Sequence, residues 1–299
     1  MKQSIYVFGT GFLGKNYIDY FIDHNFLVHS FSRSSNVHRL HPNLIHQKVD
    51  LINDEFNIEH VASLKAIIYV VSTTVAGIVN HEETIQDEIF ALRKVLHLLK
   101  NHPNSKFFLI SSASVYGVSN GSSFSEMDAC KPTSMYALMK KRLEEVLMQH
   151  TTTNQSSYYI FRVSNLFGPY QFRQGIVAKV LNAHKFKQPI IVFNKGQTIR
   201  DFLFVEDLLY LTLLFIDGDI ECGIYNISSG KGVSVNSIID YISSIYPIHN
   251  NLVVYHDTEE PNPFNVLNNS KVKTIFPNWS VTPLNNSLTR TIQWWFKHN

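Results

Sequence analysis

Three residues of the sequence could together move a proton to or from a carbonyl or hydroxyl oxygen. Tyr136 and Lys140 stand four residues apart, so on a helix they share one face, where the ammonium favours the ionised phenol. Ser112 follows closely on the apolar run Lys106–Ile110 and can donate a hydrogen bond to the reacting oxygen. On its own, a tyrosine in a helix is more often part of a hydrophobic core than of a catalytic site. We therefore predict Ser112, Tyr136 and Lys140 as catalytic residues only in combination with a site for a hydride-carrying cofactor.

Such a site is predicted near the N-terminus, where the glycine-rich motif Gly9-Thr10-Gly11-Phe12-Leu13-Gly14 follows the apolar run Ser4–Phe8 and precedes a helical pattern. Small residues at these positions let the backbone turn sharply. They also let a pyrophosphate approach the helix N-terminus, where unpaired N–H groups and the helix dipole favour anions. We predict that this motif binds a dinucleotide through Gly9, Gly11, Phe12, Leu13 and Gly14.

The end of the second apolar run bears on which dinucleotide is bound. An NAD-specific site presents Asp or Glu there to the ribose 2′-hydroxyl, but this chain has Ser32-Arg33-Ser34. A guanidinium forms charge-assisted, paired hydrogen bonds with the oxygens of a 2′-phosphate. The sequence therefore favours NADP(H) bound through Arg33, with NAD(H) possible. The alternative is that Arg33 is a solvated loop charge.

The elements that would position these residues alternate between strands and helices. Continuous apolar runs predict strands over Ser4–Phe8, Phe26–Phe31, Ala66–Val71, Lys106–Ile110 and Tyr158–Arg162. Amphipathic patterns predict helices over Asn16–Asp23, Thr84–Lys100 and Tyr136–Gln149. This order indicates an α/β fold, a Rossmann-type doubly wound parallel sheet. After residue 170 the pattern loosens, which predicts a smaller C-terminal lobe.

Composition narrows the classes of protein to consider. The 299 residues include 26 Lys and Arg against 24 Asp and Glu, and this net charge of +2 gives no reason to expect nucleic acid or a membrane as a partner. No apolar run reaches the roughly 20 residues of a membrane span, and the N-terminus is not a secretory signal. Two cysteines and scattered histidines predict neither a disulfide framework nor a metal site. We expect a globular, cytoplasmic protein.

These motifs together resemble those of the extended short-chain dehydrogenases/reductases, in the nucleotide-sugar epimerase/dehydratase/reductase family. Three further segments carry the resemblance: Arg162–Pro169 is similar to the family's RxxNxxGP, Ile199–Leu208 to RDFxxVxD and Tyr225–Gly230 to YNxxSG. The similarity extends over nearly the whole chain, as far as Thr291–Trp295 in the closing helix. It implies a nucleotide-sugar substrate.

The resemblance also implies roles for residues and regions. Asn165 and Arg200 would bind the sugar nucleotide, and Ser112 and Ser114 would contact the sugar. Asp50 and Leu51 would border the cofactor's adenine, and Tyr136 and Lys140 would touch the cofactor. For Asp201 and Asp207 we expect structural hydrogen bonds.

The same resemblance implies a division of the chain. Residues 1–166, with about 199–229, would form the dinucleotide-binding domain. About 167–198 and 230–299 would form the nucleotide-sugar-binding lobe. The family commonly forms homodimers through two helices, which correspond here to Thr84–Lys100 and Tyr136–Gln149.

The residues after Ser112 help to choose among the family's activities. Sugar 4,6-dehydratases have an Asp-Glu pair there, because eliminating water needs an additional acid and base, whereas this chain has Ala113 and Ser114. Members that epimerise C3 and C5 have a cysteine in place of Ser114, so both activities are disfavoured. Reduction of a nucleotide-linked 4-keto-6-deoxyhexose by NADPH and NAD-dependent 4-epimerisation stay open. So does a non-enzymatic NADP(H) sensor. Arg33 favours the reductase.

Overall fold

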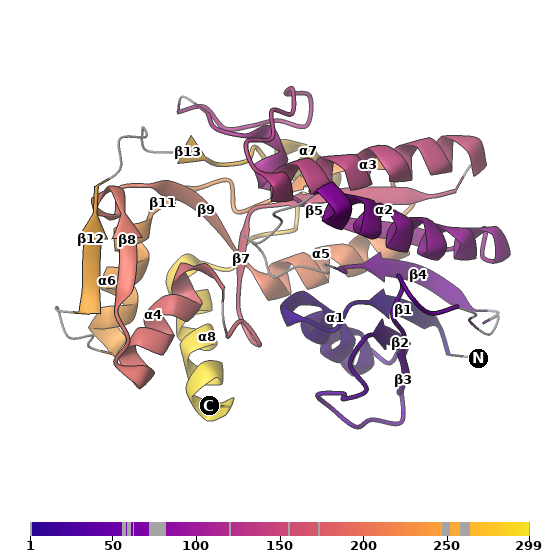
Figure 1. Cartoon of the computed structure of the whole chain (residues 1–299), viewed down its shortest axis with the longest axis horizontal. Helices are drawn as coiled ribbons and strands as arrows, with labels where there is room; N and C mark the ends of the chain where they lie inside the picture. Colours follow the sequence, from indigo (N-terminus) through magenta and orange to yellow (C-terminus); the bar gives the residue numbers. More distant parts are fainter. Residues whose placement is uncertain are drawn as a thin grey trace. The chain divides into compact units, whose positions relative to one another are not determined.

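The computed structural model describes residues 2–55, 58, 61, 63–71, 82–119, 121–154, 156–172, 174–246, 252–257 and 264–298. Figure 1 shows the chain as alternating strands and helices. It divides into two compact units. Unit 1 comprises Met1–Val115, Pro132–Arg162 and Leu209–Tyr225, and unit 2 comprises Tyr116–Lys131, Val163–Leu208 and Asn226–Asn299. The two units are defined by contacts between residues and not by what they bind. The predicted division into a dinucleotide-binding domain and a nucleotide-sugar-binding lobe therefore stays a prediction.

A seven-stranded sheet in the order β10-β6-β5-β4-β1-β2-β3 forms the centre of unit 1. The neighbours β1 and β2, β2 and β3, β1 and β4, and β4 and β5 are paired in parallel. The bounds are β1 Ser4–Phe8, β2 Leu27–Ser32, β3 Leu44–Lys48, β4 Leu64–Tyr69, β5 Lys106–Ser112, β6 Tyr158–Val163 and β10 Gly223–Ile227. The predicted doubly wound fold is confirmed.

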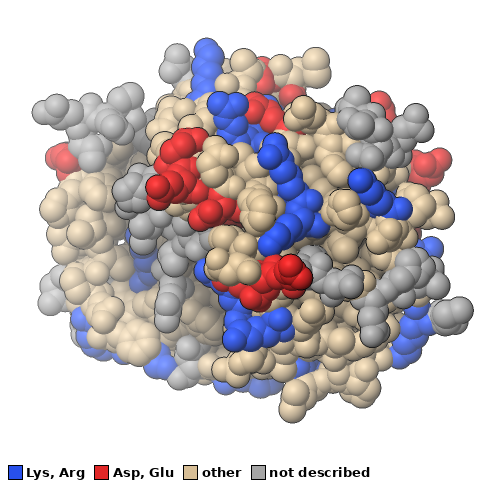
Figure 2. Space-filling model, turned by 45° about the vertical axis from the view of Figure 1, so that its right-hand side comes forward, with Lys and Arg blue, Asp and Glu red and all other residues tan. Residues whose placement is uncertain are grey.

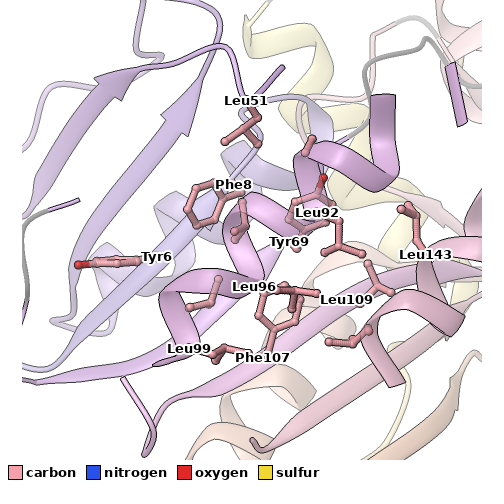
Figure 3. Close-up of a cluster of buried hydrophobic side chains, with 14 of the residues drawn as sticks. Tyr6, Phe8, Leu51, Tyr69, Leu92, Leu96, Leu99, Phe107, Leu109 and Leu143 are labelled. Carbon is pink, nitrogen blue, oxygen red and sulfur yellow. The ribbon is translucent and has the colours of Figure 1, made fainter. Parts of the chain in front are cut away.

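Helices cover both faces of this sheet. The helices α2 (Glu82–Leu96) and α3 (Met135–Asn154) lie side by side over one face (Figure 1). Their apolar side chains enclose a core with Tyr6, Phe8 and Tyr69 of the sheet (Figure 3). Because side chains alternate along a strand, Ile5 and Val7 point to the opposite face, which α1 (Phe12–Asp23) covers. A short 3-10 helix, His97–Asn101, follows α2.

Unit 2 is built from shorter elements. Its main sheet has the order β11-β9-β13, and β7 also pairs with β9, while β8 and β12 form a separate parallel pair. The strands are β7 Asn165–Phe167, β8 Ile190–Phe193, β9 Ile199–Phe204, β11 Gly232–Ser234, β12 Val253–His256 and β13 Phe264–Asn265. The helices are α4 Gly175–Phe186, α6 Val235–Ile245, α7 Ser270–Ile275 and α8 Leu284–His298, with α5 Val205–Asp217 continuing into unit 1. Two 3-10 turns span Ala113–Tyr116 and Asn194–Gly196.

No helix in the part of the chain that the structure describes combines the length and apolar character needed to cross a membrane.

Candidate active site

Ser112 is the last residue of β5, and its side-chain oxygen is held by the turn that follows. The backbone N–H of Ser114 donates to Ser112 Oγ at 3.2 Å, and Ser114 Oγ donates to it at 2.9 Å. Since Ser112 Oγ accepts both bonds, its own proton is available to donate to another oxygen. This arrangement fits the predicted role of Ser112. It also gives Ser114 an intramolecular contact that the sequence did not predict.

Tyr136 and Lys140 lie in the first two turns of α3. The Lys140 ammonium is 5.9 Å from the centroid of the Tyr136 ring, and it donates to the backbone oxygen of Ile110 at 3.1 Å. Ile110 belongs to β5, two residues before Ser112. The helix starts beside Ser134, whose Oγ accepts a hydrogen bond from the N–H of Ala137 at 3.2 Å. The structure therefore places Tyr136 and Lys140 together and connects Lys140 to the strand of Ser112.

The glycine-rich motif forms the turn between β1 and α1. Gly9 has a φ of +100°, which favours glycine, and a Cβ on Gly14 would lie 1.8 Å from the Gly9 carbonyl oxygen. Gly11 caps α1 without a side-chain hydrogen bond, and Phe12 and Leu13 begin the helix with no acidic residue in its first turn. A Cβ on Gly11 would meet nothing within 4 Å. The turn and the open helix N-terminus therefore fit a dinucleotide pyrophosphate.

Arg33 is exposed in the loop after β2 and acts electrostatically on Asp50, which follows β3. A hydrogen bond from the N–H of Ile52 lowers the pKa of Asp50, and hydrogen bonding by Asn53 and the charge of Arg33 lower it further. Leu51 instead packs into the core of unit 1. The charge of Arg33, after β2, therefore acts on the carboxylate that follows β3, and both residues are predicted to border the adenosine half of a dinucleotide.

A histidine that the sequence did not single out holds the loop of Arg33. His46 Nε2 faces the backbone oxygen of Ser34 at 2.8 Å, so this nitrogen carries the proton. His46 Nδ1 then accepts from Ser30 Oγ, also at 2.8 Å. One imidazole on β3 thus connects β2 to the loop that follows it.

Asn165 and Arg200 lie on neighbouring strands of unit 2. Asn165 Nδ2 donates to the backbone oxygen of Asp201 at 3.0 Å, across the parallel pair of β7 and β9. Arg200 is half-buried, and desolvation lowers the pKa of its guanidinium. A partly desolvated cation gains from an anionic ligand, which agrees with the predicted contact to a diphosphate.

The two neighbouring carboxylates have structural partners. Asp201 accepts hydrogen bonds from the N–H and Oγ of Ser229 at 2.9 and 2.7 Å and from the N–H of Gly230 at 3.1 Å, while burial raises its pKa. Asp207, in the first turn of α5, accepts from the N–H and Oγ1 of Thr282 at 3.0 and 2.7 Å. Both are therefore engaged in holding the chain of unit 2, as expected from the sequence.

A comparison with protein families agrees with this geometry. Residues 5–228 match the family described as the NAD dependent epimerase/dehydratase family. The chain belongs to this family. This match confirms the resemblance that the sequence motifs indicate. At the level of the family, it also confirms the prediction of an NAD(P)-dependent nucleotide-sugar enzyme.

Individual members of the family are distant relatives. A "Putative UDP-glucose 4-epimerase" of Methanocaldococcus jannaschii is 25% identical over 248 residues, which are 78% of this chain and 79% of the relative. The solved UDP-glucose 4-epimerase of Thermotoga maritima with UDP-glucose has a TM-score of 0.86 at 22% identity, covering 99% of both chains. The dTDP-glucose 4,6-dehydratase of Bacillus anthracis with NAD also has a TM-score of 0.86, at 21% identity, covering 99% of this chain and 97% of the other. The likeness to these two structures shows that this chain shares their fold.

Charge and metal-ligating groups add little to this picture. On the face of the molecule in Figure 2, acidic and basic side chains are interspersed, in keeping with the net charge of +2. Among the described residues, no three His, Cys, Asp or Glu side chains are grouped so as to hold a metal ion.

Proposed function

We propose that this family member is an NADPH-dependent reductase of a nucleotide-linked 4-keto-6-deoxyhexose. The observation that carries the proposal is the turn after β5. Ser112 Oγ accepts from Ser114, and the position that would hold an acid for water elimination is the buried Ala113. Such a site can polarise a carbonyl. It has no carboxylate at position 113 or 114 to assist the elimination of water. Simple oxidoreduction at C4 needs only Ser112, Tyr136 and Lys140.

Each of the three residues has one task in the reaction. Bound NADPH would supply the hydride to C4. The Ser112 hydroxyl donates a hydrogen bond to the C4 oxygen and polarises the carbonyl. The Tyr136 hydroxyl gives its proton to that oxygen as negative charge develops, and the Lys140 ammonium stabilises the phenolate that remains. Asn165 and Arg200 would hold the sugar nucleotide, Arg200 through its diphosphate.

The assay that tests the proposal follows NADPH consumption with dTDP-, CDP-, GDP- and UDP-linked 4-keto-6-deoxyhexoses. Oxidation of NADPH with formation of the corresponding 4-hydroxy sugar is the expected result. If none of these sugars is reduced and a UDP-hexose is interconverted at C4 without net use of cofactor, the protein is a 4-epimerase and the reductase proposal is wrong.

The 4-epimerase is the second candidate because it needs the same three side chains, and because the relative from M. jannaschii carries that name. The two candidates differ in how they use cofactor: an epimerase retains NAD⁺, whereas a reductase exchanges NADPH for NADP⁺. Nucleotide released from the purified protein distinguishes them. The Tyr136 and Lys140 pair is intact, which argues against a non-enzymatic sensor of NADP(H).

Arg33→Ala is expected to weaken NADPH binding more than tenfold and to leave NADH binding unchanged. The substitution removes a charge-assisted hydrogen bond to the 2′-phosphate, a loss of about 1.5–3 kcal/mol. Fluorescence titration with both cofactors measures the effect. Arg39→Ala is the matched control, because Arg39 pairs with Asp23 at 3.0 Å. If the wild-type protein and Arg33→Ala bind NADPH with equal affinity, Arg33 is not part of the cofactor site.

The homodimer implied by the family is a further prediction. Leu92 and Val95 of α2 are fully buried in the core of unit 1, so they are not surface for a partner, whereas Phe90 on the same helix is 48% exposed. If α2 and α3 pair with the same helices of a second copy, light scattering at micromolar concentration is expected to give twice the mass of one chain. Phe90→Glu is then expected to reduce the measured mass to that of a single chain. A monomeric wild-type protein would contradict the dimer.

A further inference from the structure

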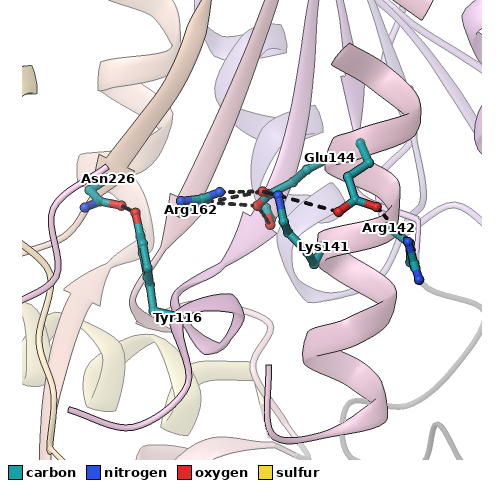
Figure 4. Close-up of polar contacts among 8 residues, drawn as sticks. Tyr116, Lys141, Arg142, Glu144, Arg162 and Asn226 are labelled. Carbon is teal, nitrogen blue, oxygen red and sulfur yellow. Dashed lines mark hydrogen bonds and ion pairs between the residues drawn. The ribbon is translucent and has the colours of Figure 1, made fainter. Parts of the chain in front are cut away.

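A buried carboxylate on α3 connects three elements of unit 1. Glu144 has no exposed surface, and its Oε1 accepts a hydrogen bond from Ser111 Oγ of β5 at 2.5 Å. Arg162 of β6, only 2% exposed, donates to the same carboxylate from Nε at 3.1 and 3.3 Å and from Nη2 at 2.7 Å. Figure 4 shows the guanidinium and the carboxylate facing each other. We name Ser111, Glu144 and Arg162 the buried brace.

The brace lies next in sequence to the predicted catalytic residues on both elements. Ser111 immediately precedes Ser112 in β5, and Glu144 follows Lys140 by four residues, one turn further along the same face of α3. A second contact joins the same two elements, since Lys140 Nζ donates to the backbone oxygen of Ile110. Two hydrogen bonds in adjacent turns therefore fix the position of α3 relative to the end of β5.

Stability alone does not account for a buried ion pair at this position. Removing two charges from water costs several kcal/mol per ion, and well-packed apolar residues often serve as well or better. What a bidentate guanidinium with a serine donor provides is a defined geometry, because each bond has a preferred distance and direction. Proton transfer depends on such geometry, since a displacement of about 1 Å can cost roughly 10² in rate.

We propose that Ser111, Glu144 and Arg162 are positioning residues that set the distance between Ser112 on β5 and the Tyr136–Lys140 pair on α3. The proposal rests on the proposed function for its effect on the reaction. Its structural content, the placement of α3 against β5, is independent of that function. None of the three residues is assigned to touch substrate or cofactor.

Ser111→Ala is the decisive variant, because it removes the bond between β5 and Glu144 and leaves the ion pair with Arg162 intact. We expect kcat to fall roughly tenfold to hundredfold, with KM changed little. The amide NMR resonances of Tyr136 and Lys140, which are distant in sequence from the substitution, are expected to shift. Ser111→Thr keeps the hydroxyl and is expected to restore both kcat and the resonances.

Tyr17→Phe is the matched control. It also removes one buried hydrogen bond of unit 1, between Tyr17 OH and Thr212 Oγ1 at 2.9 Å, but this bond joins α1 to α5. The control is expected to lower the melting temperature by about as much as Ser111→Ala and to leave kcat and the α3 resonances unchanged.

The outcomes distinguish the positioning role of the buried brace from the proposed function. If Ser111→Ala leaves the Tyr136 and Lys140 resonances in place, or moves them without lowering kcat of an active protein, the buried brace has no positioning role. An equal loss of kcat in Tyr17→Phe would likewise make it merely structural. If the resonances shift but the wild-type protein acts on no nucleotide sugar, the brace still positions α3 and the proposed function is wrong.

Discussion

Tyr136→Phe is expected to keep the fold and the affinity for cofactor and to lower turnover by about 10²–10⁴, the contribution of a positioned general acid. The phenol hydroxyl is the only group removed, and the half-buried ring still lies beside Lys140, whose ammonium is 5.9 Å from the ring centroid. Under the proposed mechanism, no side chain would then transfer a proton to the carbonyl oxygen as it acquires charge, although Ser112 would still donate a hydrogen bond to it. The loss is therefore expected in kcat, with KM nearly unchanged.

The measurement compares steady-state turnover of the wild-type protein and of Tyr136→Phe on the substrate that the assay identifies. Tyr210→Phe is the control, because Tyr210 is 47% exposed on α5 and removing its hydroxyl is expected to have no effect. Cofactor titration and thermal unfolding show whether the lower turnover arises from the chemical step alone or from weaker cofactor binding or a less stable fold. Turnover by Tyr136→Phe as fast as that of the wild-type protein would overturn the whole assignment of Ser112, Tyr136 and Lys140.

The central fold could be predicted because its strands are continuous apolar runs, buried on both faces of the sheet. All five residues of β1 are buried, and its predicted bounds agree with the structure. The edge strand β3 gave no such signal, because Leu44–Lys48 is largely polar and exposed. The sequence predicts the first helix from Asn16, whereas the helix begins at Phe12, because the glycine motif obscures its first turn.

The candidate site was predictable where its residues are close in sequence. Gly9 and Gly14 belong to one motif, and Tyr136 and Lys140 are one helical turn apart, so spacing alone reveals both pairs. The bond from Ser111 to Glu144 joins residues 33 positions apart, and the bond from His46 to Ser34 joins residues 12 apart on different elements. No local periodicity connects such residues. Their contacts depend on which elements pack together in three dimensions, which spacing along the chain does not reveal.

Gly14→Ala is expected to destabilise unit 1 by about 1–3 kcal/mol and to weaken cofactor binding. The added methyl group would lie 1.8 Å from the Gly9 oxygen and 2.7 Å from the Gly9 carbonyl carbon, and both are backbone atoms that no side-chain rotation can move away. Gly9 itself is held by its N–H, which donates to Phe31 O at 2.9 Å. The turn must therefore open, which displaces the N-terminus of α1. Thermal unfolding and cofactor titration measure the two effects.

Gly11→Ala separates the two effects, because a methyl group there meets nothing within 4 Å. Restricting the unfolded chain stabilises by about 0.4–1 kcal/mol, and replacing glycine as N-cap residue costs a comparable amount, so unfolding is expected to be unchanged. The methyl group would nevertheless be added at the cap of α1, where the pyrophosphate is predicted to approach the backbone, and cofactor affinity is expected to fall. Undiminished affinity in Gly11→Ala would show that the phosphates bind elsewhere. Wild-type stability in Gly14→Ala would show that the turn between β1 and α1 is not held closed.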